Sequence, residues 1–156
     1  MTVFLVRHAD AKSRANWPHD DESRPLTRKG VDQANGLVDL LKKRRVGRIL
    51  TSPAVRCVDT VEPLASTLGL KIEETHTLLE GADINHAYEL LRNLSRKRDS
   101  AVLCTHGDIV PELLRLAARD GLKLEEPVRW PKGSTFALEA DHGEFTQGRY
   151  FPPPGG

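Results

Sequence analysis

Short apolar runs alternate along this chain with longer segments whose apolar residues recur at helical spacing. The runs are rich in β-branched residues and end in polar ones, which is typical of buried strands. The first run starts directly after Met1 and ends abruptly in Arg7-His8. Six strands are expected, at residues 2–9, 48–52, 71–74, 101–105, 134–140 and 144–150.

The longer segments predict four helices. Thr27 is a typical N-cap for the first helix, and Gly47 is expected to end it. Pro53 suits the first turn of the second helix, and Gly69 suits its C-terminal end. The remaining two helices are expected at residues 83–97 and 108–119.

Strands that alternate with helices imply right-handed crossovers and a largely parallel sheet covered on both faces. The expected fold class is therefore α/β, a three-layer α/β/α sandwich with a mostly parallel central sheet. A length of 156 residues fits one domain, which we place at residues 1–150. Residues 151–156 are rich in Pro and Gly and are expected to form a flexible tail. Residues 10–24 are the one long irregular segment, and such loops are usually functional or disordered.

Charge, cysteine content and the length of apolar runs narrow the possible partners of the protein and its location in the cell. The chain has 23 Lys and Arg against 22 Asp and Glu, and a net charge of +1 gives no argument for binding nucleic acid or a membrane. Cys57 and Cys104 have no metal-type spacing and are expected to be reduced, buried thiols. No apolar run approaches the ~18 residues that span a bilayer. The first strand follows Met1 directly, so we expect a cytoplasmic protein without a signal peptide.

Histidines stand at the ends of two expected strands. Arg7-His8 ends the first strand, and His106-Gly107 follows the strand at residues 101–105. The carboxyl ends of strands in an α/β sheet are where ligands tend to bind. Arg56, one turn into the second helix, could reach over a neighbouring strand end. Because guanidinium groups match phosphate oxygens and helix N-termini offer unpaired N–H donors, this arrangement predicts a phosphoryl-binding site.

The motifs in this order resemble those of the histidine phosphatase superfamily (phosphoglycerate mutase-like). They are Leu5-Val-Arg-His-Ala-Asp-Ala11, Arg24-Pro-Leu-Thr27 through Gly30, Ser52-Pro-Ala-Val-Arg56 through Thr60, and Thr105-His-Gly107. Within that superfamily the chain resembles the small phosphohistidine phosphatases of the SixA type. It is also similar to the C-terminal phosphatase domain of mycobacterial MutT-type Nudix hydrolases. The resemblance covers nearly the whole chain and implies a phosphoglycerate mutase-like fold.

The resemblance implies phosphoryl transfer in two steps. His8 would attack phosphorus and become phosphohistidine, and water would then release phosphate. Arg7, Arg56 and His106 would hold the equatorial oxygens, where the charge of the transition state must be balanced. Since fixed cations would do this work, no metal and no other cofactor are expected.

Four further residues are interpreted through the resemblance. Ser52 is expected to support the pocket, and Gly107 is expected to let the chain turn tightly beside the phosphate. Ala9 departs from the usual glycine of the family, so its backbone must avoid positive φ. Glu80 lies where many relatives carry an acidic donor, which the SixA type lacks. It is either the general acid, which favours phosphoester or nucleotide substrates, or a plain surface carboxylate.

The loop at residues 10–24 carries further cations whose role the sequence leaves open. Lys12, Arg14 and Arg24 could bind the extra phosphates of a polyphosphate or nucleotide, or could belong to a solvated loop balanced by its own carboxylates. Trp17 could stack on a base or cover the edge of the core.

The expected function is a metal-independent phosphatase that acts through phospho-His8, with a SixA-like protein phosphohistidine phosphatase as the first choice. A nucleotide or other small-molecule phosphatase is the alternative, so the partner is a phosphohistidine protein or a phosphorylated small molecule. A non-catalytic phospho-ligand binder is a remote alternative. A metal-dependent hydrolase is another, with ligands taken from His8-Ala-Asp10, His19-Asp20 and His106-Gly-Asp108.

Overall fold

The computed structural model describes residues 1–125 and 128–155. Its strands are β1 (Thr2–Arg7), β2 (Val46–Thr51), β3 (Ile72–Glu74), β4 (Ser100–Thr105), β5 (Lys123–Leu124), β6 (Thr135–Asp141) and β7 (Glu144–Phe151). Its α-helices are α1 (Arg28–Leu41), α2 (Val55–Leu68), α3 (Ile84–Ser95) and α4 (Ile109–Arg119). Three short 3-10 helices are η1 (Arg14–Asn16), η2 (Asp21–Ser23) and η3 (His76–Leu78).

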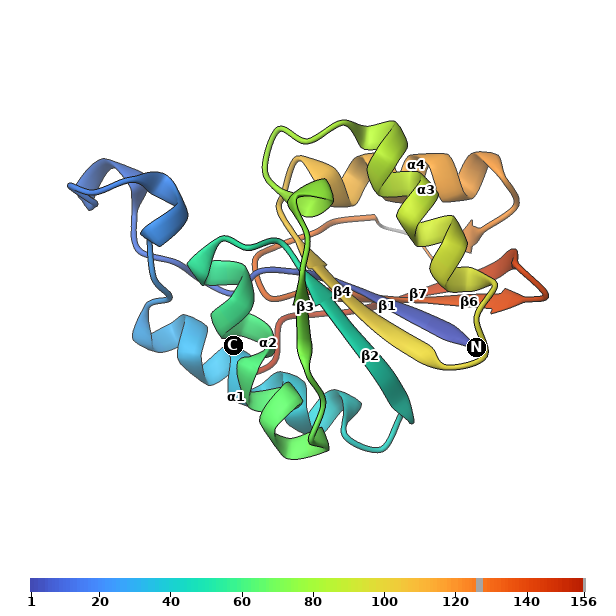
Figure 1. The fold of residues 1–156 in the computed structure, drawn as a ribbon, viewed down its shortest axis with the longest axis horizontal. Helices are drawn as coiled ribbons and strands as arrows, with labels where there is room; N and C mark the ends of the chain where they lie inside the picture. The colour runs from blue at the N-terminus through green and yellow to red at the C-terminus, as the bar shows by residue number, and fades with distance from the viewer. Residues whose placement is uncertain (126–127, 156) are drawn as a thin grey trace.

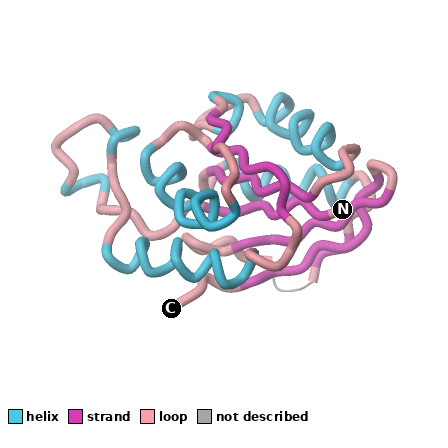
Figure 2. The backbone as a smooth tube through the Cα atoms, turned by 60° about the horizontal axis from the view of Figure 1, so that its bottom comes forward, coloured by secondary structure: helices cyan, strands magenta, loops and turns pink. Residues whose placement is uncertain are grey.

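One sheet with the order β3-β2-β4-β1-β6-β7-β5 forms the centre of the molecule. β1, β2, β3 and β4 pair in parallel, β5 pairs in parallel with β7, and β6 runs antiparallel to its two neighbours. Helices α1 and α2 lie on one face and α3 and α4 on the other (Figures 1 and 2). The predicted three-layer α/β/α sandwich with a mostly parallel sheet is confirmed.

Apolar side chains fill the space on both faces of the sheet. Leu37 of α1 and Leu64 of α2 are buried in one core, and Leu91 of α3 and Leu113 of α4 are buried in the other. Each fully buried leucine of this kind contributes roughly 1.5–3 kcal/mol relative to an exposed one. Because β1, β2 and β4 are parallel and held from both faces, the residues that follow them meet at one rigid edge.

Several helix ends follow the local signals in the sequence. Oγ1 of Thr27 accepts a hydrogen bond from the Gly30 N–H at 3.1 Å, which confirms Thr27 as the N-cap of α1. Gly69 ends α2 with a φ of 67°, as expected. The side chain of Asp83 caps α3 by accepting from the N–H of Asn85 at 2.8 Å. These caps fix the residues at which the helices begin or end.

Two predictions of helix boundaries are wrong. Gly47 lies inside β2, where an added Cβ would come 2.8 Å from Cβ of Asp99, and α1 ends earlier, at Leu41. Pro53 precedes α2 instead of forming its first turn, since the helix begins at Val55. β5 and the three 3-10 helices were not predicted, because segments of two or three residues carry no periodicity.

Residues 10–24 project from the body of the domain, on the left of Figure 1. The base of this loop is closed by a bridge between Ala11 and Leu26. The Pro-rich end was expected to be a flexible tail, but it lies against α1. The contact is so close that a Cβ added at Gly36 would come 2.5 Å from Cβ of Pro154. Among the described residues, no helix has the length and apolarity needed to cross a membrane.

Candidate active site

His8 follows β1 directly and is only 4% exposed. Its Nδ1 lies 2.8 Å from the carbonyl oxygen of Ala9. A carbonyl oxygen only accepts, so Nδ1 carries the proton and Nε2 keeps its lone pair. Burial is the main cause that lowers the pKa of His8 to about 3, electrostatic effects of His106, Arg56 and Arg7 act in the same direction, and the bond to Ala9 opposes the shift. At neutral pH His8 is therefore a neutral ring with an available Nε2.

His106 faces His8 from the end of β4. The two ring centroids are 5.4 Å apart, with an angle of 66° between the planes. Nδ1 of His106 lies 3.4 Å from Nη2 of Arg56, and Nε2 lies 2.8 Å from Oγ of Ser52. Because Arg56 can only donate, Nδ1 is the acceptor and Nε2 donates to Ser52. Ser52 is fully buried and thus orients His106, which agrees with the expected supporting role.

Arg56 is a cation with only 1% exposure on the first turn of α2. Its Nη1 donates to the carbonyl oxygen of Asp21 at 2.8 Å, and its Nη2 donates to Oδ2 of Asp21 at 3.0 Å. Its Nε has no hydrogen-bond partner among the described residues. An unsatisfied buried donor costs roughly 1–3 kcal/mol, so an anion bound here would satisfy a group that the fold leaves unpaired.

Arg7 reaches the site by passing close to Gly107. Nη1 of Arg7 donates to the carbonyl oxygen of Trp130 at 2.9 Å, and its buried Nε is unpaired within the described part of the chain. An added Cβ at Gly107 would come 2.7 Å from Cζ and from Nη2 of Arg7. Gly107 does not adopt a positive φ. Gly107 lies in the turn between β4 and α4, as expected, but the backbone of this turn does not itself require a glycine. The glycine is needed because it makes room for the guanidinium group of Arg7.

Two side chains of α2 support the histidines and were missed as site residues. Oγ1 of Thr60 accepts from the N–H of Ala9 at 2.9 Å, which fixes the backbone after His8. Sγ of Cys57 lies 3.5 Å from Nε2 of His106. Ala9 itself avoids positive φ, as expected. Cys57 directly follows Arg56, and Thr60 lies one turn later on the same face of α2, which was the signal that could have identified them.

Asp21, on the projecting loop, binds three arginines at once. Its Oδ1 lies 3.0 Å from Nε of Arg14 and 3.0 Å from Nε of Arg24, and its Oδ2 lies 3.0 Å from Nη2 of Arg56. Partial burial opposes ionisation of Asp21, but the three guanidinium groups outweigh it and hold the pKa of this carboxyl below its ordinary value. The loop thereby supplies the carboxylate that fixes Arg56. The sequence showed Asp21 only as one of several balancing charges.

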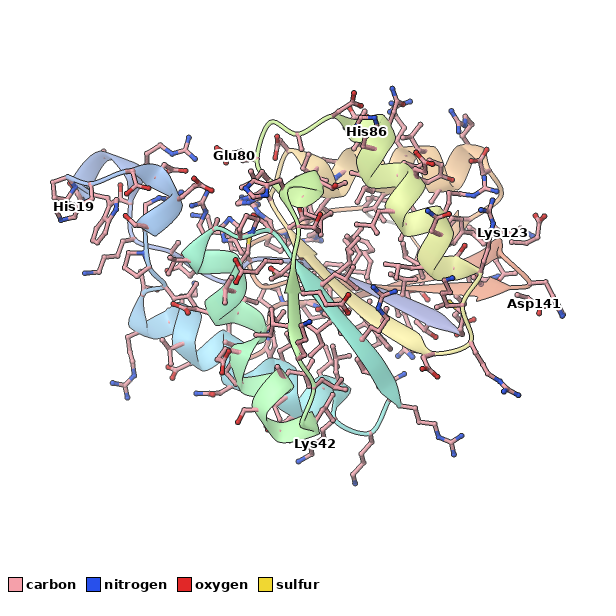
Figure 3. All side chains as sticks on the ribbon, in the orientation of Figure 1. His19, Lys42, Glu80, His86, Lys123 and Asp141 are labelled. Atoms are coloured by element: carbon pink, nitrogen blue, oxygen red, sulfur yellow. The ribbon has the colours of Figure 1, made fainter. Side chains whose placement is uncertain are left out.

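Glu80 follows η3 and belongs to the same network. Its two carboxylate oxygens lie 3.1 and 3.0 Å from Nη2 of Arg14, and Oε1 lies 3.8 Å from Nη2 of Arg56. The negative charge of Glu80 raises the pKa of Arg14. Figure 3 shows Glu80 on the side of the domain that faces the projecting loop. Arg14, Asp21, Arg56 and Glu80 thus form a ring of alternating charges, which holds Glu80 between two cations. We call it the ion-pair ring.

A cavity of about 570 Å³ lies over His8. Arg14 and Arg24 line it on the side of the loop, and Trp130 and Lys132 line it on the side of the segment before β6. The charged side chains along its wall are four cations and two carboxylates, namely Arg7, Arg14, Arg24, Lys132, Glu80 and Asp108. Trp130 and Lys132 were missed in the sequence, because only the antiparallel pairing of β1 with β6 brings them to His8.

Lys12 and Trp17 lie outside the lining of this cavity. Nζ of Lys12 is 5.9 Å from the centroid of the Trp17 ring, and Nε1 of Trp17 donates to the carbonyl oxygen of Asp20 at 3.0 Å. The ring of His19, near the tip of the loop in Figure 3, lies 5.0 Å from that of Trp17. The structure therefore uses Lys12 and Trp17 inside the loop and does not bring them to the site, where Lys12 was expected.

The ligand set that a metal-dependent hydrolase would need is not assembled by residues 1–125 and 128–155. No three side chains of His, Cys, Asp or Glu in this part of the chain are placed to hold a metal ion. Ser52 and Arg56 engage both ring nitrogens of His106, and the carbonyl of Ala9 engages Nδ1 of His8, which leaves Nε2 of His8. The arrangement instead offers fixed cations around a neutral histidine.

Known proteins resemble this chain over most of its length. A curated 8-oxo-(d)GTP phosphatase of Mycolicibacterium smegmatis is 33% identical over 156 residues, which are 98% of this chain and 48% of that protein. The chain thus spans about half the length of that relative. A phosphohistidine phosphatase SixA homolog of Haemophilus influenzae is 30% identical over 129 residues, which are 72% of this chain and 77% of that protein.

The fold agrees with these relatives. The structure of the protein histidine phosphatase SixA complexed with tungstate superposes with a TM-score of 0.80 at 26% identity, and covers 98% of this chain and 97% of that one. The histidine phosphatase superfamily (branch 1) matches residues 3–85, which are more than half of the chain. From this match and from the SixA homolog, we conclude that the chain belongs to the histidine phosphatase superfamily (branch 1) and has its phosphoglycerate mutase-like fold.

Proposed function

We propose that this protein is a phosphatase that transfers a phosphoryl group first to Nε2 of His8 and then to water, with no metal ion taking part. The observation that carries the proposal is a neutral His8 whose lone pair lies among fixed cations. In the first step an N–P bond forms as the bond from phosphorus to the leaving group breaks. In the second step water attacks phosphorus, and the electrons of the N–P bond return to Nε2.

Arg7 and Arg56 are the groups that we propose to hold the transferring phosphoryl group, with His106 beside them through its contacts with Arg56 and Ser52. The unpaired Nε atoms of the two arginines support this role, because preorganised donors stabilise charge in the transition state without reorganising. Gly107 is proposed to line the site by leaving space for Arg7. The tungstate in the SixA relative is a tetrahedral oxyanion, which is in line with an anion site on this fold.

The substrate that we propose first is phosphohistidine on a protein, as in the SixA relatives. Glu80 supports this choice, because the ion-pair ring holds it between Arg14 and Arg56 instead of leaving it free to protonate a leaving group. An imidazole leaves phosphorus with little help from an acid, whereas an alkoxide requires it. We therefore propose Glu80 as a residue that positions Arg14, and not as the general acid.

Nucleotides are the second candidate substrates. The observation that favours them is the size and charge of the cavity, since about 570 Å³ lined by four cations exceeds what one phosphoryl group occupies. The mycobacterial relative is an 8-oxo-(d)GTP phosphatase, which is consistent with this candidate.

Phosphate release in the presence of EDTA tests the proposal. The substrates are p-nitrophenyl phosphate, nucleoside di- and triphosphates and a phosphohistidine protein, each with the unaltered chain, with His8→Ala and with His19→Ala as the matched control. We expect turnover that survives the chelator, is lost in His8→Ala and is kept in His19→Ala. Turnover that requires a divalent ion, or that persists in a folded His8→Ala variant, would overturn the proposal.

A further inference from the structure

We infer that the cavity holds a second phosphate beside the transferred one, through Lys132, and that nucleoside diphosphates are accordingly substrates. The inference rests on the proposed phospho-His8 chemistry and names the leaving group that the cavity is built to hold. The bond cleaved is the phosphoanhydride, and the product that leaves first is a nucleoside monophosphate.

Hydrogen bonds of the neighbouring Gly133 hold the backbone at Lys132 close to His8. The N–H of Gly133 donates to the carbonyl oxygens of His8 at 2.9 Å and of Arg7 at 3.2 Å. The carbonyl oxygen of Trp130 accepts from Nη1 of Arg7 at 2.9 Å. The segment that carries Lys132 is thus bound to β1 on both sides of the lysine, and the side chain lines the cavity together with His8.

The charge of Lys132 is available to a ligand. Arg14 and Arg24 also line the cavity, but both are bound to the carboxylate of Asp21. Within residues 1–125 and 128–155, Lys132 forms no ion pair with a carboxylate. An ammonium group binds a phosphate as a point charge. A second phosphate next to the one on His8 would find its counter-charge in Lys132.

Trp130 continues the cavity with an apolar surface. It is partly buried against the core, and it lines both the cavity and an adjoining hollow of about 310 Å³. Val128 and Pro131 line that hollow as well, and Arg7 belongs to both. Aromatic side chains offer a face on which a base stacks. The cavity over His8 thus combines cations, an ammonium group and an aromatic ring, which are the groups that the phosphates and the base of a nucleoside diphosphate would need.

This leaving group can depart without a general acid, which is consistent with a Glu80 that is held in the ion-pair ring. Nε2 of His8 attacks the terminal phosphorus, and the bond from that phosphorus to the bridging oxygen breaks with its electron pair going to the oxygen. The nucleoside monophosphate leaves as an anion and needs no proton from Glu80, because a phosphate is already a weak base (its second pKa is about 6). Water then attacks phospho-His8, one of its protons is released to solvent, and inorganic phosphate is formed.

The test compares the selectivity of the unaltered chain with that of Lys132→Gln. The kcat/KM values are measured in EDTA for adenosine diphosphate, adenosine monophosphate and p-nitrophenyl phosphate. Lys123→Gln is the control, since Lys123 is exposed on β5 and lies far from Glu80 in Figure 3. We expect the diphosphate to be preferred over the monophosphate, and this preference to fall roughly ten- to a hundredfold in Lys132→Gln, as for a lost charge-assisted bond. Lys123→Gln should keep it.

Two results would overturn the inference. The unaltered chain could turn over the diphosphate no faster than the monophosphate, or Lys132→Gln could lower kcat/KM equally for all three substrates. If p-nitrophenyl phosphate is still hydrolysed in a His8-dependent manner, only the inference fails and the proposed function stands. If no substrate depends on His8, the proposed function itself fails.

Discussion

At the scale of single residues, the site depends on one histidine that stays neutral among cations. Burial removes water from His8, and the arginines on either side repel a proton, so its pKa falls to about 3. The hydrogen bond from Nδ1 to the Ala9 carbonyl fixes the remaining proton on the far side of the ring. The proposed nucleophile therefore needs no general base to free its lone pair.

The low pKa of His8 can be measured directly. NMR titration of the His8 ring should give a midpoint near pH 3, and not near the ordinary value of about 6.5. Because the unfolded chain takes up this proton at the ordinary value, it binds more protons than the native state between these two pH values. The contribution of His8 therefore lowers the free energy of unfolding as the pH falls through this range. A midpoint near 6.5 would contradict the electrostatic description of the site.

Gly107 is predicted to be required by Arg7. In Gly107→Ala the new Cβ would meet the guanidinium group at 2.7 Å, and the flexible end of Arg7 would move away while the fold is kept. We expect KM to rise roughly tenfold or more, as for one lost charge-assisted bond, with little change in melting temperature.

The double variant Gly107→Ala/Arg7→Lys supplies the control for this prediction. If Gly107 acts by making room for Arg7, the double variant should be little worse than Arg7→Lys alone. Losses that add fully in the double variant would show that Gly107 has another role.

At the scale of elements, parallel strands bring the histidines together and a loop completes the site. β1 and β4 are neighbours in the sheet, so His8 and His106 follow them at the same edge. The loop at residues 10–24 then reaches back across this edge through the ion-pair ring. Two residues of the loop form the contacts: Asp21 forms an ion pair with Arg56, and Arg14 forms one with Glu80.

Asp21→Asn is predicted to loosen this loop and to weaken the site. The amide keeps the shape of the side chain but removes the charge that three arginines share. We expect faster amide hydrogen exchange over residues 12–24, because the loop loses its ion pairs. We also expect kcat to fall several-fold, because Arg56 loses the carboxylate that fixes it. Asp20→Asn is the matched control, because its side chain does not cap η2 and forms no ion pair in the described part of the chain. Similar exchange rates in both variants would contradict the role given to Asp21.

The parts that were predictable from the sequence are those set by short-range patterns. The strand endings placed Arg7, His8 and His106 at one edge, because periodicity reports burial directly. The roles of Asp21, Trp130 and Lys132 were not predictable, since contacts between distant segments decide where loops lie. Gly47 was misread for a related reason, because its requirement arises from Asp99 in a neighbouring connection and not from a helix end.

At the scale of the whole molecule, the charges nearly cancel, while cations outnumber carboxylates on the wall of the cavity. A net charge of +1 does not draw anions to the surface in general. Any attraction for anions therefore comes from the four cations on the wall of the cavity, which lies at the edge of a sheet that is covered on both faces. The fold supplies a rigid edge, and the loop and the segment before β6 supply charged side chains that line the cavity at this edge.

The measurement that tests the central claim most directly is the trapping of the phosphoenzyme. The unaltered chain is mixed with p-nitrophenyl phosphate in EDTA, quenched under alkaline conditions that preserve phosphohistidine, digested and examined by mass spectrometry. We predict one added phosphoryl group on His8, and none in His8→Ala. A chain that turns over substrate without a phosphoryl group on His8, or that carries it on another residue, would contradict the account.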